Sequence, residues 1–325
     1  MSLHDFARKK RTELREQGPA HALWSTTQEL RSKLATPYAR HRATPIWAAN
    51  ADVVLVLDGL RYDTWSRVID VELATKTEPR YSLGSASVEW INETFADRFE
   101  SSWSRAGYVT GNPHSAKDGG HRWRDVSVYP LKDRGIAYLD EVWRDQWHID
   151  EYETVRPEIM TERGLYAYKN ADVDSLVVHY MQPHVPFRSL SETGGWKNTL
   201  AFGESDADKK DDWFKLRDGE IPAKDFWCAY RDNLRWVLNE VERWQSIVDG
   251  KILVTSDHGN AAGEWGQWGH PPGSGNPALR KVPWVLLEGD GKEMGAINPP
   301  GDPPVTEGVG DVDGVNDRLE ALGYR

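Results

Sequence analysis

The feature that most limits the possible folds is a series of short apolar runs, several of which stop at an acidic residue or a histidine. Residues 51–57 read ADVVLVL and are followed at once by Asp58. Runs of this kind are typical of parallel strands buried on both faces. Similar runs lie at 107–110, 175–179, 252–255 and 282–287. Helical patterns separate them, at 88–99, 136–147 and 226–247. This alternation predicts an α/β fold with a mostly parallel sheet and helices on both faces.

The segments outside this alternation suggest a domain organisation. Residues 4–36 have helical composition interrupted near Gly18-Pro19, which predicts one or two amphipathic helices on the domain surface. We therefore expect an N-terminal helical extension at 1–48 and a catalytic domain at 49–325. A polar stretch around 190–225 is interpreted as an insertion, either a lid over the site or a surface excursion. A short helix is expected at 315–322.

Composition limits the compartment and the partners. Hydrophobic residues make up 39% of the chain, and no apolar run approaches the roughly 20 residues needed to cross a bilayer, so no transmembrane segment is predicted. The basic N-terminus has no apolar segment behind it and does not resemble a signal peptide, which favours a cytoplasmic location. A net charge of −11 argues against a nonspecific nucleic-acid binder. The sequence does not indicate an oligomeric state.

Polar residues follow three of the predicted strands. Asp58 ends the first, Asp257 and His258 follow ILVT, and His184 follows SLVVH in the loop HYMQPHVPF. In open α/β sheets, ligands bind at the carboxyl ends of the strands. Carboxylate oxygens and imidazole nitrogens at one edge would suit a divalent cation. The sequence therefore predicts a metal site at this edge.

The stretches LVLDGLRYD, HYMQPHVPF and SDHGNAAGEWGQWGHP, in this order, resemble the alkaline phosphatase and sulfatase superfamily over roughly residues 50–288. The resemblance implies an alkaline-phosphatase-like fold. It also implies a hydroxyl nucleophile at the start of a helix, and the matching stretch is YSLGSASVEWINETF. We expect the nucleophile to be Ser87, with Ser85 as an alternative, because a helix N-terminus favours an ionised oxygen. Ser87 would otherwise be only an N-cap.

The resemblance implies roles for further residues. One divalent cation, Zn²⁺ or Mn²⁺ with Mg²⁺ or Ca²⁺ also tolerated, would be held by a set of four residues, Asp58, Ser87, Asp257 and His258. His184 and His270 would bind oxygens of the transferred group or complete a second metal site. Members with two metals usually carry Asp where this chain has Tyr180, which favours one cation. The expected substrate-binding residues are Arg61, Asn112 and His179. Arg61 has the alternative of a structural salt bridge with Asp63.

The expected reaction is cleavage or transfer of a phosphate ester through a phosphoseryl intermediate, by a metal-dependent hydrolase or transferase. The substrate would be a small-molecule or glycan-linked anionic ester. A sulfatase is the first alternative, although Ser87 is followed by Val88-Glu89-Trp90-Ile91 and not by the x-Pro-x-Arg that formylglycine formation requires. A catalytically inactive homologue that binds an anion or a partner protein is the second.

Overall fold

The computed structural model describes residues 7–8, 10–12, 14–15, 18–69, 76–115, 134–146, 154–192, 212–292 and 297–304, together with residues 73, 131 and 295. The predicted helix at 315–322 and most of the insertion around 190–225 lie outside the described residues. The division at residue 48 stays a prediction.

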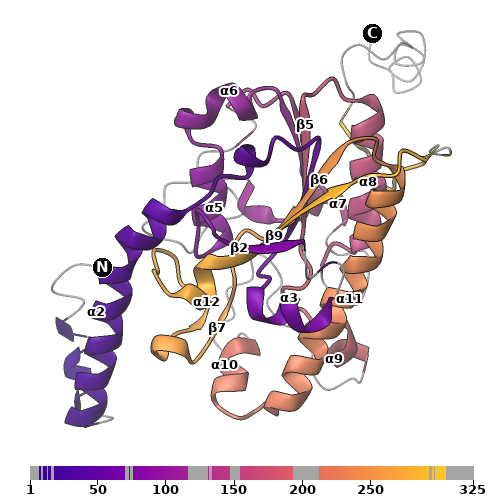
Figure 1. The fold of residues 1–325 in the computed structure, drawn as a ribbon. Helices are drawn as coiled ribbons and strands as arrows, with labels where there is room; N and C mark the ends of the chain where they lie inside the picture. The colour runs from indigo at the N-terminus through magenta and orange to yellow at the C-terminus, as the bar shows by residue number, and fades with distance from the viewer. Residues whose placement is uncertain are drawn as a thin grey trace, which may run out of the picture.

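A seven-stranded sheet forms the centre of the molecule, in the order β2-β9-β6-β1-β5-β3-β4 (Figure 1). The strands are β1 (Val53–Leu57), β2 (Thr77–Tyr81), β3 (Ala106–Thr110), β4 (Tyr138–Asp140), β5 (Ser175–Tyr180), β6 (Lys251–Thr255) and β9 (Lys281–Glu288). The five strands β6, β1, β5, β3 and β4 run parallel, whereas β9 is antiparallel to both β6 and β2. The α/β fold class and the five predicted strands are confirmed.

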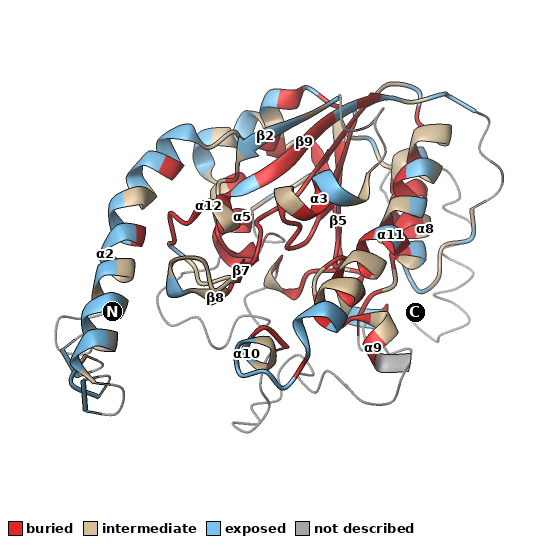
Figure 2. Ribbon diagram, turned by 60° about the horizontal axis from the view of Figure 1, so that its bottom comes forward, coloured by how far each residue is buried: buried red, intermediate tan, exposed pale blue. Residues whose placement is uncertain are grey.

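Helices cover both faces of the sheet, because its strands carry apolar side chains on both sides. On one face α8 (Pro157–Asn170) and α11 (Ala223–Ile247) pack on a core that includes Leu55, Val178 and Trp244. On the other face α5 (Ser87–Thr94) packs through Trp90 onto Val56. Figure 2 shows the sheet as the most deeply buried part of the molecule.

The remaining elements are short, apart from one long helix. They comprise α3 (Tyr62–Val68), α6 (Glu100–Trp103), α7 (Trp143–Gln146), α9 (Arg188–Glu192), α10 (Asp212–Arg217), α12 (Pro277–Arg280) and the hairpin of β7 (Ala261–Ala262) and β8 (Trp268–Gly269). The long helix α2 (Pro19–Arg42) begins where the break was predicted and lies along one side of the molecule (Figure 1).

Two sequence-based expectations need correction. The helix predicted at 136–147 is strand β4 followed by the single turn α7, because Tyr138 and Leu139 pair with β3 at the edge of the sheet. The helix predicted at 88–99 ends as α5 at Thr94, and 97–99 is a separate 3₁₀ turn. Strand β2 was not expected, since its sequence TEPRY contains a proline and its side chains are largely exposed.

Candidate metal and nucleophile site

The parallel register of the sheet brings the predicted site residues to one edge. Val56 pairs with His179 on one side and with Thr255 on the other, so β1, β5 and β6 end at nearly the same level. Asp58 follows the end of β1 directly, and Asp257 follows β6 by two residues. The convergence at the carboxyl ends of the strands that the sequence predicts is therefore confirmed.

Three buried polar atoms at this edge have no hydrogen-bond partner among the described residues: Asp58 Oδ1, His179 Nε2 and Asp257 Oδ2. Asp58, His179 and Asp257 offer ligand atoms that all lie within 4.8 Å of one another. His179 Nε2 is 3.6 Å from Asp257 Oδ2 and 3.8 Å from Asp58 Oδ2. A buried polar atom left without a partner costs about 1–3 kcal/mol, and one divalent cation would satisfy all three. The donor set therefore fits a bound cation.

Each of the two carboxylates has one oxygen that the protein itself holds by hydrogen bonds. Asp257 Oδ1 accepts hydrogen bonds from the backbone N–H groups of Gly59 at 2.9 Å and His258 at 2.8 Å. Asp58 Oδ2 accepts one from the Asn112 side-chain amide at 2.6 Å. Gly59 has a φ of 65°, and a Cβ there would lie 2.6 Å from the Asn260 amide nitrogen, so only glycine fits this turn. These bonds leave Asp58 Oδ1 and Asp257 Oδ2 available to a cation.

The two carboxylates differ in their affinity for protons. Burial and the neighbouring Asp257 raise the pKa of Asp58 well above its usual value. Burial would also raise the pKa of Asp257, but the nearby His258 and His179 outweigh it and lower that pKa. Two carboxylates this close repel each other, and a bound cation would relieve that repulsion.

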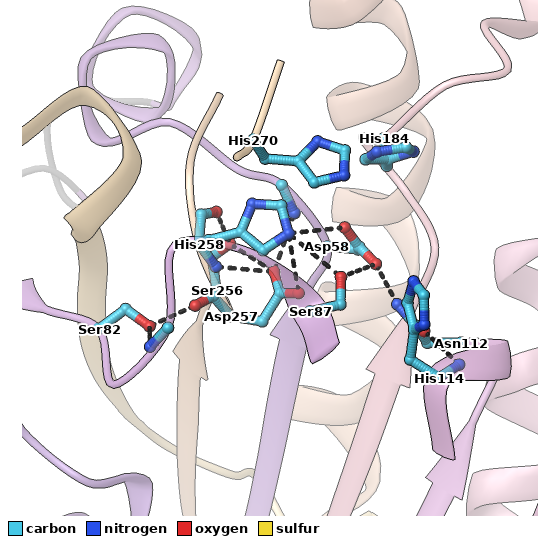
Figure 3. A network of polar contacts seen from close by, with 12 residues as sticks. Asp58, Ser82, Ser87, Asn112, His114, His184, Ser256, Asp257, His258 and His270 are labelled. Carbon is cyan, nitrogen blue, oxygen red and sulfur yellow. Dashed lines mark hydrogen bonds and ion pairs between the residues drawn. The ribbon is translucent and has the colours of Figure 1, made fainter. Parts of the chain in front are cut away.

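Ser87 lies beside this cluster at the first turn of α5. Its Oγ is 3.1 Å from His258 Nε2 and 3.3 Å from Asp58 Oδ2 (Figure 3). The N-cap of α5 is Ala86, without a side-chain capping bond, so Ser87 does not act as the cap. Ser85 faces elsewhere, because its hydroxyl contacts Glu89 Oε2 and the Pro271 carbonyl oxygen, each at 2.9 Å. The geometry thus favours Ser87 over Ser85 as the nucleophile.

Three histidines at the site share one tautomer. Nδ1 of His258 and Nδ1 of His184 each lie 2.8 Å from a backbone carbonyl oxygen, of Gly259 and Val185 respectively. Nδ1 of His270 is 3.0 Å from Asn260 Oδ1. Carbonyl and amide oxygens only accept, so each Nδ1 carries a proton, and in the neutral form of each ring Nε2 is the nitrogen with the lone pair. Such an Nε2 can bind a cation or take up a proton.

The histidine rings form a continuous group above the carboxylates. His270 stacks on His258 with ring centroids 4.8 Å apart, and His184 meets His270 edge to face at 5.0 Å. Figure 3 shows His184 and His270 on the side of the group away from the strands. Burial and the neighbouring His258 lower the pKa of His270 well below its usual value. His270 is therefore neutral at pH 7.

The expected substrate-binding residues take other positions. His179 is fully buried within β5, with its Nε2 at the cation cluster. Asn112 donates to Asp58 and so orients a carboxylate. Arg61 is ion-paired with Asp63 at 2.8 Å and with Glu264 at 2.7 Å, and it donates to the Asn260 carbonyl oxygen at 2.6 Å. The structural salt bridge considered as the alternative for Arg61 is thus present. Substrate binding by Arg61, Asn112 and His179 stays a prediction.

Sequence reasoning missed several residues around the site. Tyr108 lies on β3 with its hydroxyl 2.7 Å from His179 Nδ1, and Asn260 holds His270. His114 follows β3, where the strand-end rule could have identified it; burial lowers its pKa to about 4, with a contribution from His258 and His184. Tyr108 and Asn260 gave no such signal, because their roles depend on neighbouring strands and loops.

Comparison with protein-family models and with curated proteins found no match. Solved structures do match. The soluble domain of lipooligosaccharide phosphoethanolamine transferase A from Neisseria meningitidis is 14% identical over 74% of this chain and 76% of that chain, with a TM-score of 0.45. The integral membrane protein of the same name is 13% identical over 74% of this chain, with a TM-score of 0.44. The C-terminal periplasmic domain of EcEptC from Escherichia coli, in complex with Zn, is 9% identical over 74% of this chain and 72% of that one, with a TM-score of 0.41.

This chain spans 47% of the integral membrane protein. At these identities the likeness concerns the fold alone.

One expectation from the sequence is contradicted. A cytoplasmic location was expected, whereas one matched structure is described as an integral membrane protein and one as a periplasmic domain. The cytoplasmic location is therefore withdrawn. Among the residues that the structure describes, no helix has the length and apolar character needed to cross a bilayer.

Proposed function

We propose that this chain is a divalent-metal-dependent enzyme that transfers a group from a phosphate ester through Ser87. The main support is the position of the Ser87 hydroxyl beside three buried ligand atoms that have no hydrogen-bond partner. Buried ligand atoms of this kind destabilise the fold unless they bind a partner such as a cation. They lie beside Ser87, the group that would act as nucleophile.

The cation would be held by the set that the resemblance implies, Asp58, Ser87, Asp257 and His258, with His179 as a further ligand. His258 Nε2 is 3.3 Å from Asp257 Oδ2 and 3.8 Å from Asp58 Oδ1, so it borders the same point. When bound, the cation would lower the pKa of the serine hydroxyl and stabilise negative charge on the phosphate oxygens. Mixed oxygen and nitrogen ligands favour Zn²⁺ or Mn²⁺ over Mg²⁺ or Ca²⁺.

In the first half of the reaction Ser87 Oγ forms a bond to phosphorus while the bond from phosphorus to the leaving oxygen breaks. The proton of Ser87 passes to Asp58 Oδ2, which lies 3.3 Å away and is held by Asn112. The group remains on Ser87 as a seryl phosphate ester, and its position at the first turn of α5 places it near backbone N–H groups that favour an anion.

In the second half an acceptor hydroxyl attacks this phosphorus, the bond to Ser87 Oγ breaks, and the proton held on Asp58 Oδ2 returns to Ser87 Oγ. The oxygen that left in the first half takes its proton from water. His270 is the group we assign to remove the acceptor's proton, because its Nε2 carries a lone pair at neutral pH. His184, which meets His270 edge to face, would orient the transferred group. Because Nδ1 of each ring donates to the protein, Nε2 donates to an anionic oxygen only when the ring is protonated, and the expectation that both histidines bind such oxygens requires that form.

The proposed substrate is an anionic phosphate ester, either a small molecule or a glycan-linked group. The absence of x-Pro-x-Arg after Ser87 disfavours a sulfatase with formylglycine. An inactive homologue that merely binds an anion would have no need of a nucleophile next to the ligand cluster. Such a homologue would also cleave none of the phosphate esters.

The experiment compares wild type with Ser87→Ala and Asp257→Asn for cleavage of p-nitrophenyl phosphate, bis-p-nitrophenyl phosphate and p-nitrophenyl sulfate, alongside elemental analysis of bound metal. Ser66→Ala is the matched control, because Ser66 is exposed on α3. We expect Ser87→Ala to keep the metal but lose about 10³-fold or more of phosphate-ester cleavage. Mass spectrometry should find a phosphate adduct on the peptide that contains Ser87. Metal-free, inactive wild-type protein would refute the proposal.

A further inference from the structure

The inner face of helix α2 carries small and polar residues and packs against the loop that contains His270. Ser32 and Ala39 are buried there, and Ser32 Oγ lies 3.0 Å from Ser274 Oγ. Thr36 donates to the Gly273 carbonyl oxygen at 3.0 Å. A Cβ at Gly275 would lie 2.4 Å from the α2 backbone, so the helix and this loop are in close contact. Figure 1 shows α2 along one side of the molecule, with its N-terminal part extending beyond the sheet.

The outer face of α2 carries the leucines. Leu23 is 68% exposed, Leu30 56% and Leu34 72%. These residues are 7 and 4 positions apart, so they lie on one side of the helix. A helix at the surface of a globular protein ordinarily turns its leucines inward, and α2 has the reverse arrangement. In Figure 2 most of α2 is coloured as exposed or intermediate. The amphipathic helix predicted from the sequence is present, but its leucine face points away from the domain.

The surroundings of this leucine face are aromatic and basic. Trp24 is 48% exposed and Tyr38 56% exposed, and both lie along one flank. Arg31 lies on the same flank and Arg40 on the other. Residues 1–42 contain nine lysine and arginine residues against four acidic residues, in a chain whose net charge is −11. Positive charge is thus concentrated in the segment that carries the exposed leucines.

From these observations we propose that α2 binds an anionic lipid surface. The leucines Leu23, Leu30 and Leu34 would enter the boundary between headgroups and acyl chains, and the excess positive charge of residues 1–42 would attract the acidic headgroups. Helices that combine an apolar face, aromatic residues and basic residues typically lie in the plane of a membrane interface.

A second copy of this chain fits the same face less well. Thr27 and Pro37 fall on the leucine stripe and would interrupt a helix–helix seam, which requires complementary side chains at each level. Basic residues on the two flanks would also face one another in a symmetric pair. A lipid surface has no fixed holes to match and supplies the opposite charge.

Helix α2 packs on a loop of the candidate metal and nucleophile site, so lipid binding through α2 would affect where that site lies. The loop on which it packs extends from Glu264 to Asn276 and carries His270. Arg40 also reaches Glu89 on the nucleophile helix α5, at 3.2 Å. Binding through α2 would therefore hold the site close to the lipid. Lipid binding itself does not depend on the proposed chemistry and is measured without it.

The test is co-sedimentation of the full chain with phosphatidylcholine vesicles that contain or lack phosphatidylglycerol. The variant is a triple replacement, Leu23→Gln, Leu30→Gln and Leu34→Gln, and the control is Leu286→Gln, which changes an exposed leucine on β9. We expect wild type and control to prefer anionic vesicles by about tenfold or more, and the triple variant to lose at least about tenfold in binding. High salt should weaken binding of the wild type.

Two results would overturn the proposal. One is equal sedimentation of wild type and triple variant with anionic vesicles. The other is a concentration-dependent dimer in light scattering, without vesicle binding, that disappears in the triple variant; this would assign the leucine face to a second copy. Unchanged circular dichroism of the triple variant would confirm that it is folded.

Discussion

The strand-end site and helix α2 depart from the usual distribution of residues in opposite ways. At the site, buried polar atoms of Asp58, His179 and Asp257 have no partner within the described chain. On α2, the side chains of Leu23 and Leu34 are more exposed than covered. Each arrangement costs the isolated chain something, and each is satisfied by a different kind of ligand. A cation suits the first and an apolar, anionic surface suits the second.

The largest effect is expected from Asp58→Asn at the strand-end site. We expect activity to fall about 10³-fold with loss of the cation, because a carboxylate ligand becomes a neutral amide. The metal-free variant should be at least as stable as metal-free wild type, because repulsion with Asp257 is removed. Activity assays and urea unfolding in chelator would measure both. Asp232→Asn, at a partly exposed position of α11, is the control. A metal-free variant clearly less stable than metal-free wild type would show that Asp58 is structural.

A polar cluster next to the site should behave differently because its partners are present. Glu89 accepts from Arg280 at 2.8 Å and from the Ser85 and Gly273 amides at 2.9 and 3.0 Å. Burial would raise the pKa of Glu89, but Arg280 and these amides lower it from 4.5 to about 2. A folded pKa below the unfolded one stabilises the fold above pH 4.5, and this stability is lost as the pH falls towards 2.

Replacing Glu89 by Gln should therefore cost about 3 kcal/mol of unfolding free energy at pH 7. The variant should also lose part of the acid dependence of stability between pH 4.5 and 2. Urea unfolding across this range would measure it, with Glu93→Gln on the same helix as the control. The same pH profile in wild type and Glu89→Gln would contradict the role of this carboxylate.

A smaller effect is expected from Tyr108→Phe. The Tyr108 hydroxyl contacts His179 Nδ1 and has Thr110 as a further side-chain partner, so it fixes the ring with Nε2 towards the carboxylates. Its loss should weaken cation affinity about 10- to 100-fold, which is typical for the partner of a metal-binding histidine. Competition with a chromophoric chelator would measure this. Affinity equal to that of Tyr38→Phe, at an exposed position of α2, would exclude His179 as a ligand.

The smallest effect is predicted for the leucine face of α2. Replacing Leu23, Leu30 and Leu34 by Gln should change the unfolding free energy by less than about 0.5 kcal/mol per site, because exposed side chains contribute little and glutamine is nearly as good a helix former as leucine. Thermal unfolding would detect a larger change. Strong destabilisation would mean that these leucines are covered within the protein itself.

Much of the fold and part of the site could be predicted from the sequence. The central strands have continuous apolar runs, and their polar ends at Asp58 and Asp257 mark the edge where ligands bind. The positions of His179 and Tyr108 could not be predicted, because they depend on the order of β5 and β3 in the sheet. For α2, periodicity identifies the apolar face but does not say which way it points. Strand β4 was missed because pairing at the sheet edge overrides a helical pattern.

The central claim is that Asp58, His179 and Asp257 together bind a divalent cation. Its most direct test is calorimetric titration of chelator-treated protein with Zn²⁺ and with Mn²⁺, in wild type and in His179→Ala. We predict one tight site per chain in wild type, and a loss of about 10-fold or more in affinity when His179 is replaced. No binding to wild type, or equal affinity in the two proteins, would contradict the claim.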